Sequence, residues 1–309
     1  MSHQFSDGDI GCDQHDAFLK PAERSAIGLG KNFRVVGTPP VALGADHSDP
    51  PDAAPLGAMN EPRGPKQTAR RLAQRAADAL VGTRLGSIHS VRTDQPLVAL
   101  TFDDGPDPKW TPRMLDVLAG QQAHATFFML VESARALPKL VRRVVAEGHE
   151  VGLHGLDHRS LAGGSRRSTR CLLEAAASEL AAISGTPITY FRPPFCAQTV
   201  ASFLGARDAG LETVVYNLDS FDWSGREEQQ VASGVVIGAA PGSVVVLHDR
   251  LATDPRCAFD RSTTLQLVVD GLQRRSLHST TLSRLIASGK VRRTAWFSLR
   301  AELGRWVST

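Results

Sequence analysis

The feature that most constrains the fold is an alternation of short apolar runs with helix-patterned segments from about residue 90 onward. Six runs rich in β-branched, aromatic and leucine residues recur there: LVALTF (97–102), ATFFML (125–130), EVGLH (150–154), TYFRPPF (189–195), ETVVYNL (212–218) and SVVVLH (243–248). The segments between them, such as TPRMLDVLAG and RSTRCLLEAAASELAAIS, repeat apolar residues at helical spacing. Buried strands that alternate with helices predict an α/β fold with a parallel sheet, either open or closed into a barrel.

Polar side chains stand where the predicted strands end. Asp103 and Asp104 follow the first run, and His154, Arg192 and His248 lie at the ends of later ones. In a parallel barrel the carboxyl ends of the strands share one rim, and active sites are built at that rim. We therefore expect a barrel whose rim gathers these side chains.

The segments that flank this pattern differ from it in composition. Residues 1–65 hold 8 of the 18 prolines and no tryptophan or tyrosine, which predicts a disordered extension. Residues 66–89 are expected to form a basic amphipathic helix, over 66–81, and a linker. The main domain is expected over 90–289, and residues 290–309 form a basic tail that we expect to be a terminal helix docked by its tryptophans.

Two further elements are expected near the end of the main domain. Residues 260–273 have the pattern of a helix, and residues 280–286 that of a short strand leading into a helical turn. The four cysteines are scattered without a Cys-x-x-Cys pair, so we expect thiols rather than a disulfide framework or a thiolate zinc site. They are Cys12, Cys171, Cys196 and Cys257.

Bulk composition excludes several classes of protein. The chain is 42% hydrophobic and 22% charged, which excludes a wholly disordered or collagen-like chain. A net charge of +3 does not call for a nucleic-acid partner, and no oligomeric state is indicated. No apolar run is long enough for a membrane span, and the first residues lack a signal-peptide pattern. The default expectation is a cytoplasmic location, with export left open if translation starts elsewhere, for example at Met59.

Two motifs together indicate a metal site. Asp103 and Asp104 lie on a tight Gly-Pro turn, and adjacent carboxylates repel one another unless a cation intervenes. His154 and His158 are four residues apart, a spacing that on a helix or helical turn aims both imidazoles at one point. Alone, each motif has an ordinary alternative, namely a solvated turn or a chance pair of histidines. One carboxylate with two imidazoles leaves coordination positions open, as in catalytic rather than structural metal sites.

The remaining strand ends supply acid–base candidates. Arg192 precedes two prolines, Asp222 precedes Trp223, and His248 closes a buried strand. A hydrolytic site needs a base for the attacking water, an acid for the leaving group and donors for an oxyanion. Each residue also has a structural alternative: a surface ion pair for Arg192, a helix cap for Asp222 and a packed histidine for His248.

Taken in order, TFDDGP, HGLDH, RPPF, DSFDW and VLH resemble the five motifs of the polysaccharide deacetylases, carbohydrate esterases with a NodB-homology domain. The resemblance covers about residues 97–286, and five ordered motifs are far more specific than one. It implies a distorted (β/α) barrel of about seven strands with a divalent metal at its rim. Zinc is the metal expected, with cobalt, nickel or manganese as alternatives. The reaction implied is hydrolytic removal of an acetyl group from an N-acetylated or O-acetylated sugar.

The resemblance also implies roles for individual residues. Asp104, His154 and His158 match the metal ligands of the family. Asp103 matches the general base, and Arg192 the cation that holds this carboxylate ionised and oriented.

A second group of residues matches the acid and the substrate pocket. His248 is implied as the general acid and Asp222 as the carboxylate that keeps it cationic. The backbone N–H of Phe195 is implied as the oxyanion donor. Trp223 and Val246 are implied to line the small pocket for the acetyl methyl group.

The chain departs from the family pattern at three positions. Gly155 replaces a hydroxyl residue that would brace the loop after His154, which puts the bracing of the site in doubt. Phe195-Cys196 stands where Tyr-Gly is usual, and Val246 where leucine is common. One alternative is therefore a related C–N hydrolase that acts on a small amide, imide or formamide. Another is a barrel that binds glycans without turning them over, although no ligand, base or acid is missing.

Overall fold

The computed structural model describes residues 86–250 and 260–295. The chain divides into two units, Met1–Glu61 and Pro62–Thr309, and all described residues belong to the second. The expected extension over 1–65, the expected helix over 66–81, and Trp296 and Trp306 of the tail lie outside the described residues.

The fold is organised by one parallel sheet whose strand order along the main path is β6-β5-β4-β3-β2-β8-β7, with β9 paired to β2. The ladder pairings are all parallel. The strand bounds are β2 Leu97–Asp103, β3 Thr126–Leu130, β4 Glu150–Gly155, β5 Tyr190–Phe191, β6 Glu212–Thr213, β7 Leu218–Asp219, β8 Val244–His248 and β9 His278–Thr280. The seven-strand path and the helices around it confirm the predicted distorted (β/α) barrel.

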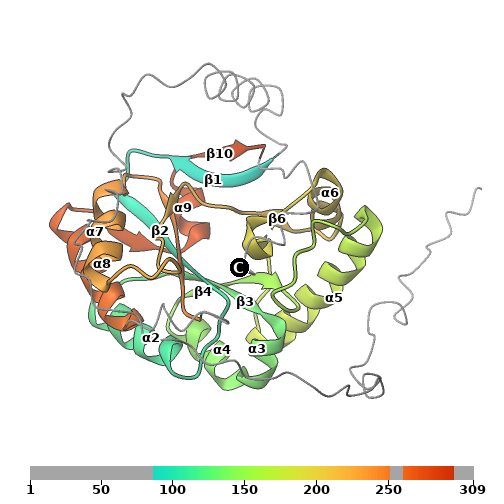
Figure 1. Cartoon of the computed structure of the whole chain (residues 1–309), viewed down its shortest axis with the longest axis horizontal. Helices are drawn as coiled ribbons and strands as arrows, with labels where there is room; N and C mark the ends of the chain where they lie inside the picture. The colour runs from blue at the N-terminus through green and yellow to red at the C-terminus, as the bar shows by residue number, and fades with distance from the viewer. Residues whose placement is uncertain (1–85, 251–259, 296–309) are drawn as a thin grey trace, which may run out of the picture. The chain divides into compact units, whose positions relative to one another are not determined.

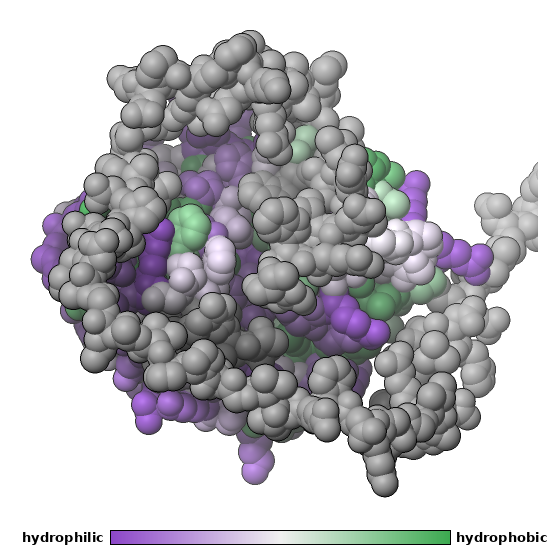
Figure 2. Space-filling view, in the orientation of Figure 1, coloured by the Kyte–Doolittle hydropathy of each residue, from purple (hydrophilic) through white to green (hydrophobic). Residues whose placement is uncertain are grey.

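Helices cover the outside of the curled sheet, as Figure 1 shows. Their bounds are α2 Trp110–Gly120, α3 Val131–Ala136, α4 Pro138–Ala146, α5 Arg166–Ser184, α6 Val200–Asp208, α7 Glu228–Gly238, α8 Arg261–Arg274 and α9 Leu282–Ala287. The apolar faces of these helices and the strands bury a core that includes Phe102, Leu115, Phe127, Leu173 and Val268, each at most 1% exposed. The described residues visible in Figure 2 are mainly hydrophilic, as expected when the apolar residues are inside.

One predicted strand is two separate strands in the structure. The run 212–218 forms β6 and β7, which lie at opposite ends of the strand order. The residues between them contact another element instead: Val214 forms a bridge with Ile88, and the Val215 N–H donates to the Ile88 carbonyl at 2.8 Å. No ladder joins β6 to β7 among the described strands, so the prediction of one continuous strand was wrong.

Other corrections follow from local chemistry. The run 189–195 contributes only the two residues of β5, because Pro193 and Pro194 have no N–H to donate to a ladder. The chain turns there through a 3-10 helix, Pro194–Cys196. The short strand expected at residue 280 begins earlier, at His278, as β9.

The start of the expected tail helix is a strand. Residues Lys290–Thr294 form β10, which pairs antiparallel with β1, Ser87–Arg92. The first residues of β1 fall within the segment expected to be a linker. Gly289 permits this pairing, because a Cβ at this position would lie 2.2 Å from the Arg92 carbonyl oxygen. Lys-Val-Arg-Arg-Thr therefore belongs to the folded domain.

The structure also describes the state of two cysteines and the length and apolar character of the helices. Cys171 is disulfide-bonded, so the expectation of a thiol at this position was wrong, whereas the buried Cys196 side chain remains a thiol. In the described ranges no helix combines the length and the apolar character needed to cross a membrane.

Candidate active site

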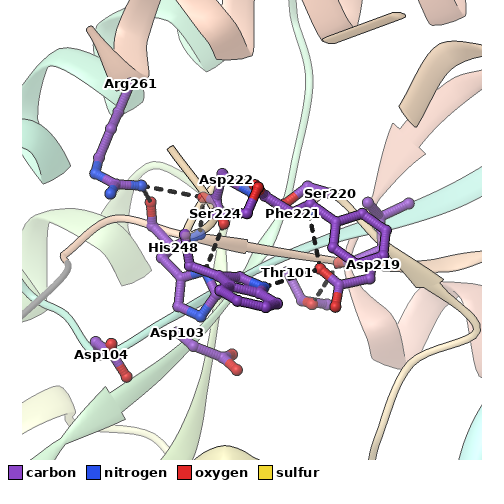
Figure 3. Close-up of polar contacts among 12 residues, drawn as sticks. Thr101, Asp103, Asp104, Asp219, Ser220, Phe221, Asp222, Ser224, His248 and Arg261 are labelled. Atoms are coloured by element: carbon purple, nitrogen blue, oxygen red, sulfur yellow. Dashed lines mark hydrogen bonds and ion pairs between the residues drawn. The ribbon is translucent and has the colours of Figure 1, made fainter. Parts of the chain in front are cut away.

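Parallel register brings the predicted polar side chains to one rim. Asp103, the last residue of β2, is the Cα partner of His248, the last residue of β8. On the other side of β2, Phe128 of β3 pairs with Asp103 and Met129 pairs with Leu153, the residue before His154. Because parallel strands end at the same edge of a sheet, these residues cluster at their carboxyl ends. Figure 3 shows the His248 ring between the Asp222 carboxylate and the side chains of Asp103 and Asp104.

Asp104, His154 and His158 form a compact group of ligand atoms. The Nε2 atoms of both histidines lie 3.2 Å from Asp104 Oδ1. One ligand atom from each residue lies within 4.8 Å of the other two. Asp104 is 3% exposed and His154 is 2% exposed, while His158 is partly open to solvent. The three predicted ligands therefore converge on one point.

The hydrogen bonds of this group are compatible with a shared cation. The other ring nitrogen of His154, Nδ1, lies 2.8 Å from the Arg192 carbonyl oxygen and must donate to it. In neutral His154, Nε2 then carries a lone pair that faces Asp104 Oδ1, a buried oxygen for which no hydrogen-bond donor is found among the described residues. Two acceptors 3.2 Å apart repel unless a cation lies between them. The donor set of two imidazoles and a carboxylate suits a divalent transition metal.

The Asp104 carboxylate is ionised in these surroundings. Burial alone would raise its pKa, but the neighbouring imidazoles, His154 above all and then His248 and His158, lower it to about 2. Burial lowers the pKa of His158, although the charge of Asp104 acts in the opposite direction. An ionised carboxylate beside a neutral imidazole is the protonation state that metal binding requires.

The local backbone differs from the predicted helical turn. His154 is on β4 and His158 lies in the bend that follows, so the two imidazoles converge through a turn rather than along a helix. Gly155 makes this turn with a φ of +126°, and a Cβ there would lie 2.9 Å from the Asp157 carbonyl oxygen. The glycine is thus required by the chain path, and a hydroxyl side chain could not occupy it without strain.

Asp103 and Arg192 form a fully buried ion pair. Arg192 is 0% exposed, and its Nη1 donates to Asp103 Oδ1 and to Thr101 Oγ1, both at 2.7 Å. Its guanidinium also stacks over the Phe128 ring at 4.2 Å. A guanidinium held on three sides fixes the orientation of the carboxylate that it binds. The structure thus places the Arg192 guanidinium on the Asp103 carboxylate, while the roles of the two residues stay predictions.

The buried Asp222 and the partly exposed His248 form a second pair. Asp222 Oδ1 lies 2.7 Å from His248 Nδ1, and its Oδ2 accepts the His248 backbone N–H at 2.8 Å. Burial would lower the pKa of His248, but the charge and hydrogen bond of Asp222 raise it to about 9. Burial would likewise raise the pKa of Asp222, yet the charge of His248 lowers it. His248 is therefore cationic at neutral pH.

Arg261 completes this pair and was missed in the sequence analysis. The single Nη1 atom of Arg261 donates to Asp222 Oδ2 at 3.0 Å and to the His248 carbonyl oxygen at 2.7 Å. Arg261 is the first residue of α8, and Asp260 caps that helix. No motif marks this arginine, because its contacts depend on how α8 packs beside β8.

The remaining predicted residues lie around these groups. Phe195 has a left-handed φ of 58°, is 49% exposed, and places its ring 4.2 Å from that of His158. Trp223 is 48% exposed, and its Nε1 donates to Asp219 Oδ1 at 3.4 Å. Val246 is buried in β8, two residues before His248, so both side chains lie on the same face of the strand.

Two buried groups near the rim carry large pKa shifts. Burial raises the pKa of the Cys196 thiol to about 12, although the charge of Arg192 acts against this shift. Burial also raises the pKa of Asp249 to about 7, with only partial compensation from a hydrogen bond with Thr111. Asp249 follows His248 directly and was another residue that the sequence analysis did not single out.

The sequence is similar to those of known deacetylases. The family model described as polysaccharide deacetylase matches residues 90–214. A chitooligosaccharide deacetylase of Sinorhizobium fredii is 37% identical over 171 residues, which cover 55% of this chain and 80% of that protein.

The fold is also similar to those of solved deacetylase structures. The Bc1960 peptidoglycan N-acetylglucosamine deacetylase is 28% identical with a TM-score of 0.60, and the match covers 65% of this chain and 93% of that chain. A family 4 acetyl xylan esterase from Clostridium thermocellum, solved with a cobalt ion, is 30% identical with a TM-score of 0.56 and matches 62% of this chain and 90% of that one. With these similarities and the five motifs at one rim, the chain belongs to the polysaccharide deacetylase family.

Proposed function

We propose that this protein is a metal-dependent deacetylase that hydrolyses the acetamido group of an N-acetylated sugar. One observation carries the proposal: Asp104 Oδ1 is buried, lacks a donor within the described ranges, and faces the Nε2 atoms of His154 and His158. The relatives named above, a chitooligosaccharide deacetylase and a peptidoglycan N-acetylglucosamine deacetylase, support the substrate class.

Asp104, His154 and His158 would hold a divalent cation, for which zinc is our first choice. Such a cation supplies Lewis-acid polarisation of the acetyl carbonyl and acidifies water. Asp103 then acts as the general base that accepts the proton of the attacking water. Arg192 keeps the Asp103 carboxylate in one orientation through the 2.7 Å contact, so the proton-accepting oxygen does not have to be reorganised during the reaction.

His248 acts as the general acid. Its pKa of about 9 keeps the imidazolium populated at neutral pH, and Nδ1 is engaged by Asp222, so Nε2 is the donor to the leaving nitrogen. The backbone N–H of Phe195 stabilises the oxyanion of the tetrahedral intermediate, while Trp223 and Val246 enclose the acetyl methyl group. Protonation of the amine completes C–N cleavage, which gives acetate and the amino sugar.

The test is acetate release from N-acetylated chito-oligosaccharides by metal-stripped and zinc-loaded protein. We expect activity only with metal, and its abolition by chelator or by His154→Ala. The panel also contains peptidoglycan fragments, acetyl xylan, formylated sugars and allantoin-like imides. Release of acetate from xylan alone, or turnover of the small amides alone, would replace the N-acetyl sugar assignment. If the loaded protein binds the glycans without turning any of them over, it is a binding barrel and not an enzyme.

A further inference from the structure

Asp249 is a buried carboxyl group that the proposed chemistry does not use. It is 1% exposed, and its Oδ2 accepts the Thr111 hydroxyl at 2.5 Å. Its Oδ1 is buried and has no hydrogen-bond partner in the described part of the chain. The carboxyl group lies against Gly105 so closely that a Cβ at position 105 would come within 2.2 to 2.5 Å of its three atoms.

The contacts of Asp249 hold both ends of the turn that carries Asp103 and Asp104. At the start of the turn, the Asp249 N–H donates to the Asp103 carbonyl oxygen at 3.3 Å. At its end, Thr111 binds the Asp249 carboxyl group and also accepts the Asp107 N–H at 2.8 Å. In the middle, Gly105 packs against the carboxyl group. Asp249, the residue directly after β8, thus contacts the 103–111 turn at its start and its middle and, through Thr111, at its end.

We propose that Asp249 is a positioning residue that locks the turn bearing the base and the metal carboxylate onto the strand bearing the general acid. The proposal rests on the proposed metal-dependent function. Its physical basis is that Asp104 stands at a φ of 75° on this turn, a conformation that a residue with a side chain holds only when its surroundings impose it. The Asp249–Thr111 contact and the fit against Gly105 supply that constraint.

The chain contains a matched control for this contact at the amino ends of the strands. Thr126 is fully buried like Thr111, donates to the Glu150 carboxylate at 2.8 Å and accepts the Leu282 N–H at 2.8 Å. Thr111 and Thr126 therefore make the same two kinds of hydrogen bond, one from the hydroxyl to a carboxyl group and one from a backbone N–H. Thr111→Val and Thr126→Val remove equivalent interactions from the two ends of the sheet.

The first experiment compares these two variants in the full chain. Zinc affinity is measured by competition with a chromophoric chelator, and hydrogen exchange is followed across residues 103–111 in the metal-free protein. We expect Thr111→Val to weaken zinc binding by about 10-fold to 100-fold, the range found when groups that orient metal ligands are removed. We expect it to speed exchange in the turn by about 10-fold. Thr126→Val lowers the melting temperature but leaves both measurements as in the wild type.

The second experiment uses the close packing at Gly105. Gly105→Ala is expected to weaken zinc binding because the new methyl group displaces the Asp249 carboxyl group. Asp249→Ala removes the three atoms that clash, so the double variant should bind zinc as tightly as Asp249→Ala alone. Asp249→Asn retains an oxygen acceptor for Thr111 and should lose less affinity than Asp249→Ala.

The outcomes separate this proposal from the proposed function. Wild-type protein that binds no zinc would refute the metal site. The hydrogen-exchange measurement on the metal-free protein would still test whether Asp249 holds the turn in position. The positioning role of Asp249 is refuted if Thr111→Val and Thr126→Val change hydrogen exchange in the turn equally. It is also refuted if the losses from Gly105→Ala and Asp249→Ala add in the double variant.

Discussion

The half-buried Glu150 at the amino ends of the strands and the buried Asp104 and Asp249 at the carboxyl ends differ in their hydrogen bonding. At the amino ends of the strands, both Glu150 oxygens have partners: Thr126 and the Ser283 N–H bind Oε2, and the Ser283 hydroxyl donates to Oε1. At the carboxyl ends, Asp104 Oδ1 and Asp249 Oδ1 have no hydrogen-bond partner within the described ranges. Glu150 is therefore satisfied within the fold. An unsatisfied acceptor costs stability, and at Asp104 this cost fits a group that binds a cation.

Backbone conformation draws a weaker contrast. Around the site, Asp104, Phe195, Cys196 and Phe221 combine a left-handed φ with a side chain, and Gln122 and Ser276 do so shortly before β3 and β9, at the amino ends of these strands. Such residues cost free energy and cluster where function requires a particular geometry. More of these residues lie at the rim that carries the proposed site than at the opposite end.

The largest effect is expected from Asp103→Asn. The amide cannot accept the proton of the attacking water, so kcat should fall by about 10³-fold, within the usual range for loss of a general base. Zinc affinity should stay within a few-fold of wild type, because Asp103 is outside the group of ligand atoms. Steady-state kinetics with a parallel zinc titration make the measurement, and Asp116→Asn on the exposed face of α2 is the control. Unchanged kcat would remove Asp103 from the mechanism.

A pH profile tests the pair that contains His248. Because its folded pKa of about 9 lies above the ordinary value of 6.5, the Asp222–His248 contact stabilises the fold fully below about pH 6.5. That stabilisation is lost as the pH rises through 9. The rate should fall on the same alkaline limb, because deprotonated His248 cannot donate.

Asp222→Asn tests whether the Asp222 carboxylate sets the alkaline limb of this pH profile. Loss of the carboxylate charge should move the alkaline limb of kcat toward lower pH and reduce kcat by about 10²-fold. The melting temperature of the wild type should exceed that of the variant most below pH 6.5 and converge with it above pH 9. An alkaline limb that is identical in both proteins would show that His248 does not supply the proton.

Arg261→Met is expected to have a smaller effect. It removes the donor shared by Asp222 Oδ2 and the His248 carbonyl oxygen, so the pair loses orientation but keeps its own contact. We expect kcat to fall by about 10-fold with KM little changed. Arg261→Lys should recover part of the loss, and Arg274→Met at the exposed last residue of α8 is the control. A change in KM alone would argue for a contact with substrate instead.

The smallest effects are changes in stability with opposite signs at the two ends. Asp104→Asn puts an amide donor beside the two imidazole acceptors, so the metal-free variant should gain about 1 kcal/mol in the free energy of unfolding. Glu150→Gln disrupts satisfied hydrogen bonds and should lose about 1 kcal/mol. Urea unfolding of both metal-free variants measures the difference. If both variants lose the same free energy of unfolding, the missing hydrogen bond at Asp104 Oδ1 does not destabilise the metal-free protein, and the comparison fails.

Much of the rim could be predicted from the sequence, because strand ends in a parallel sheet are marked by the transition from apolar to polar residues. This reasoning located Asp104, His154 and His248, and the structure brings them to one edge. Arg261 could not be found in this way, since its contact with Asp222 spans 39 residues and depends on helix packing.

The errors of prediction have physical causes as well. The run 212–218 has an unbroken strand-like pattern, yet its middle pairs with Ile88 and not with a neighbouring strand. Apolar periodicity reports burial but not the partner that provides it. The sequence shows only that Asp249 directly follows His248. Its packing against Gly105, which suggests its role, is visible in the structure alone.

The buried Cys196 side chain has a practical consequence for handling the protein. A thiol with a pKa of about 12 is almost entirely protonated at neutral pH, and it is the thiolate that attacks alkylating reagents and disulfides. Iodoacetamide or glutathione should therefore leave the folded protein unmodified at this position, although Arg192 is close by. Labelling of Cys196 would then report unfolding of the rim, which makes the residue a built-in probe of its integrity.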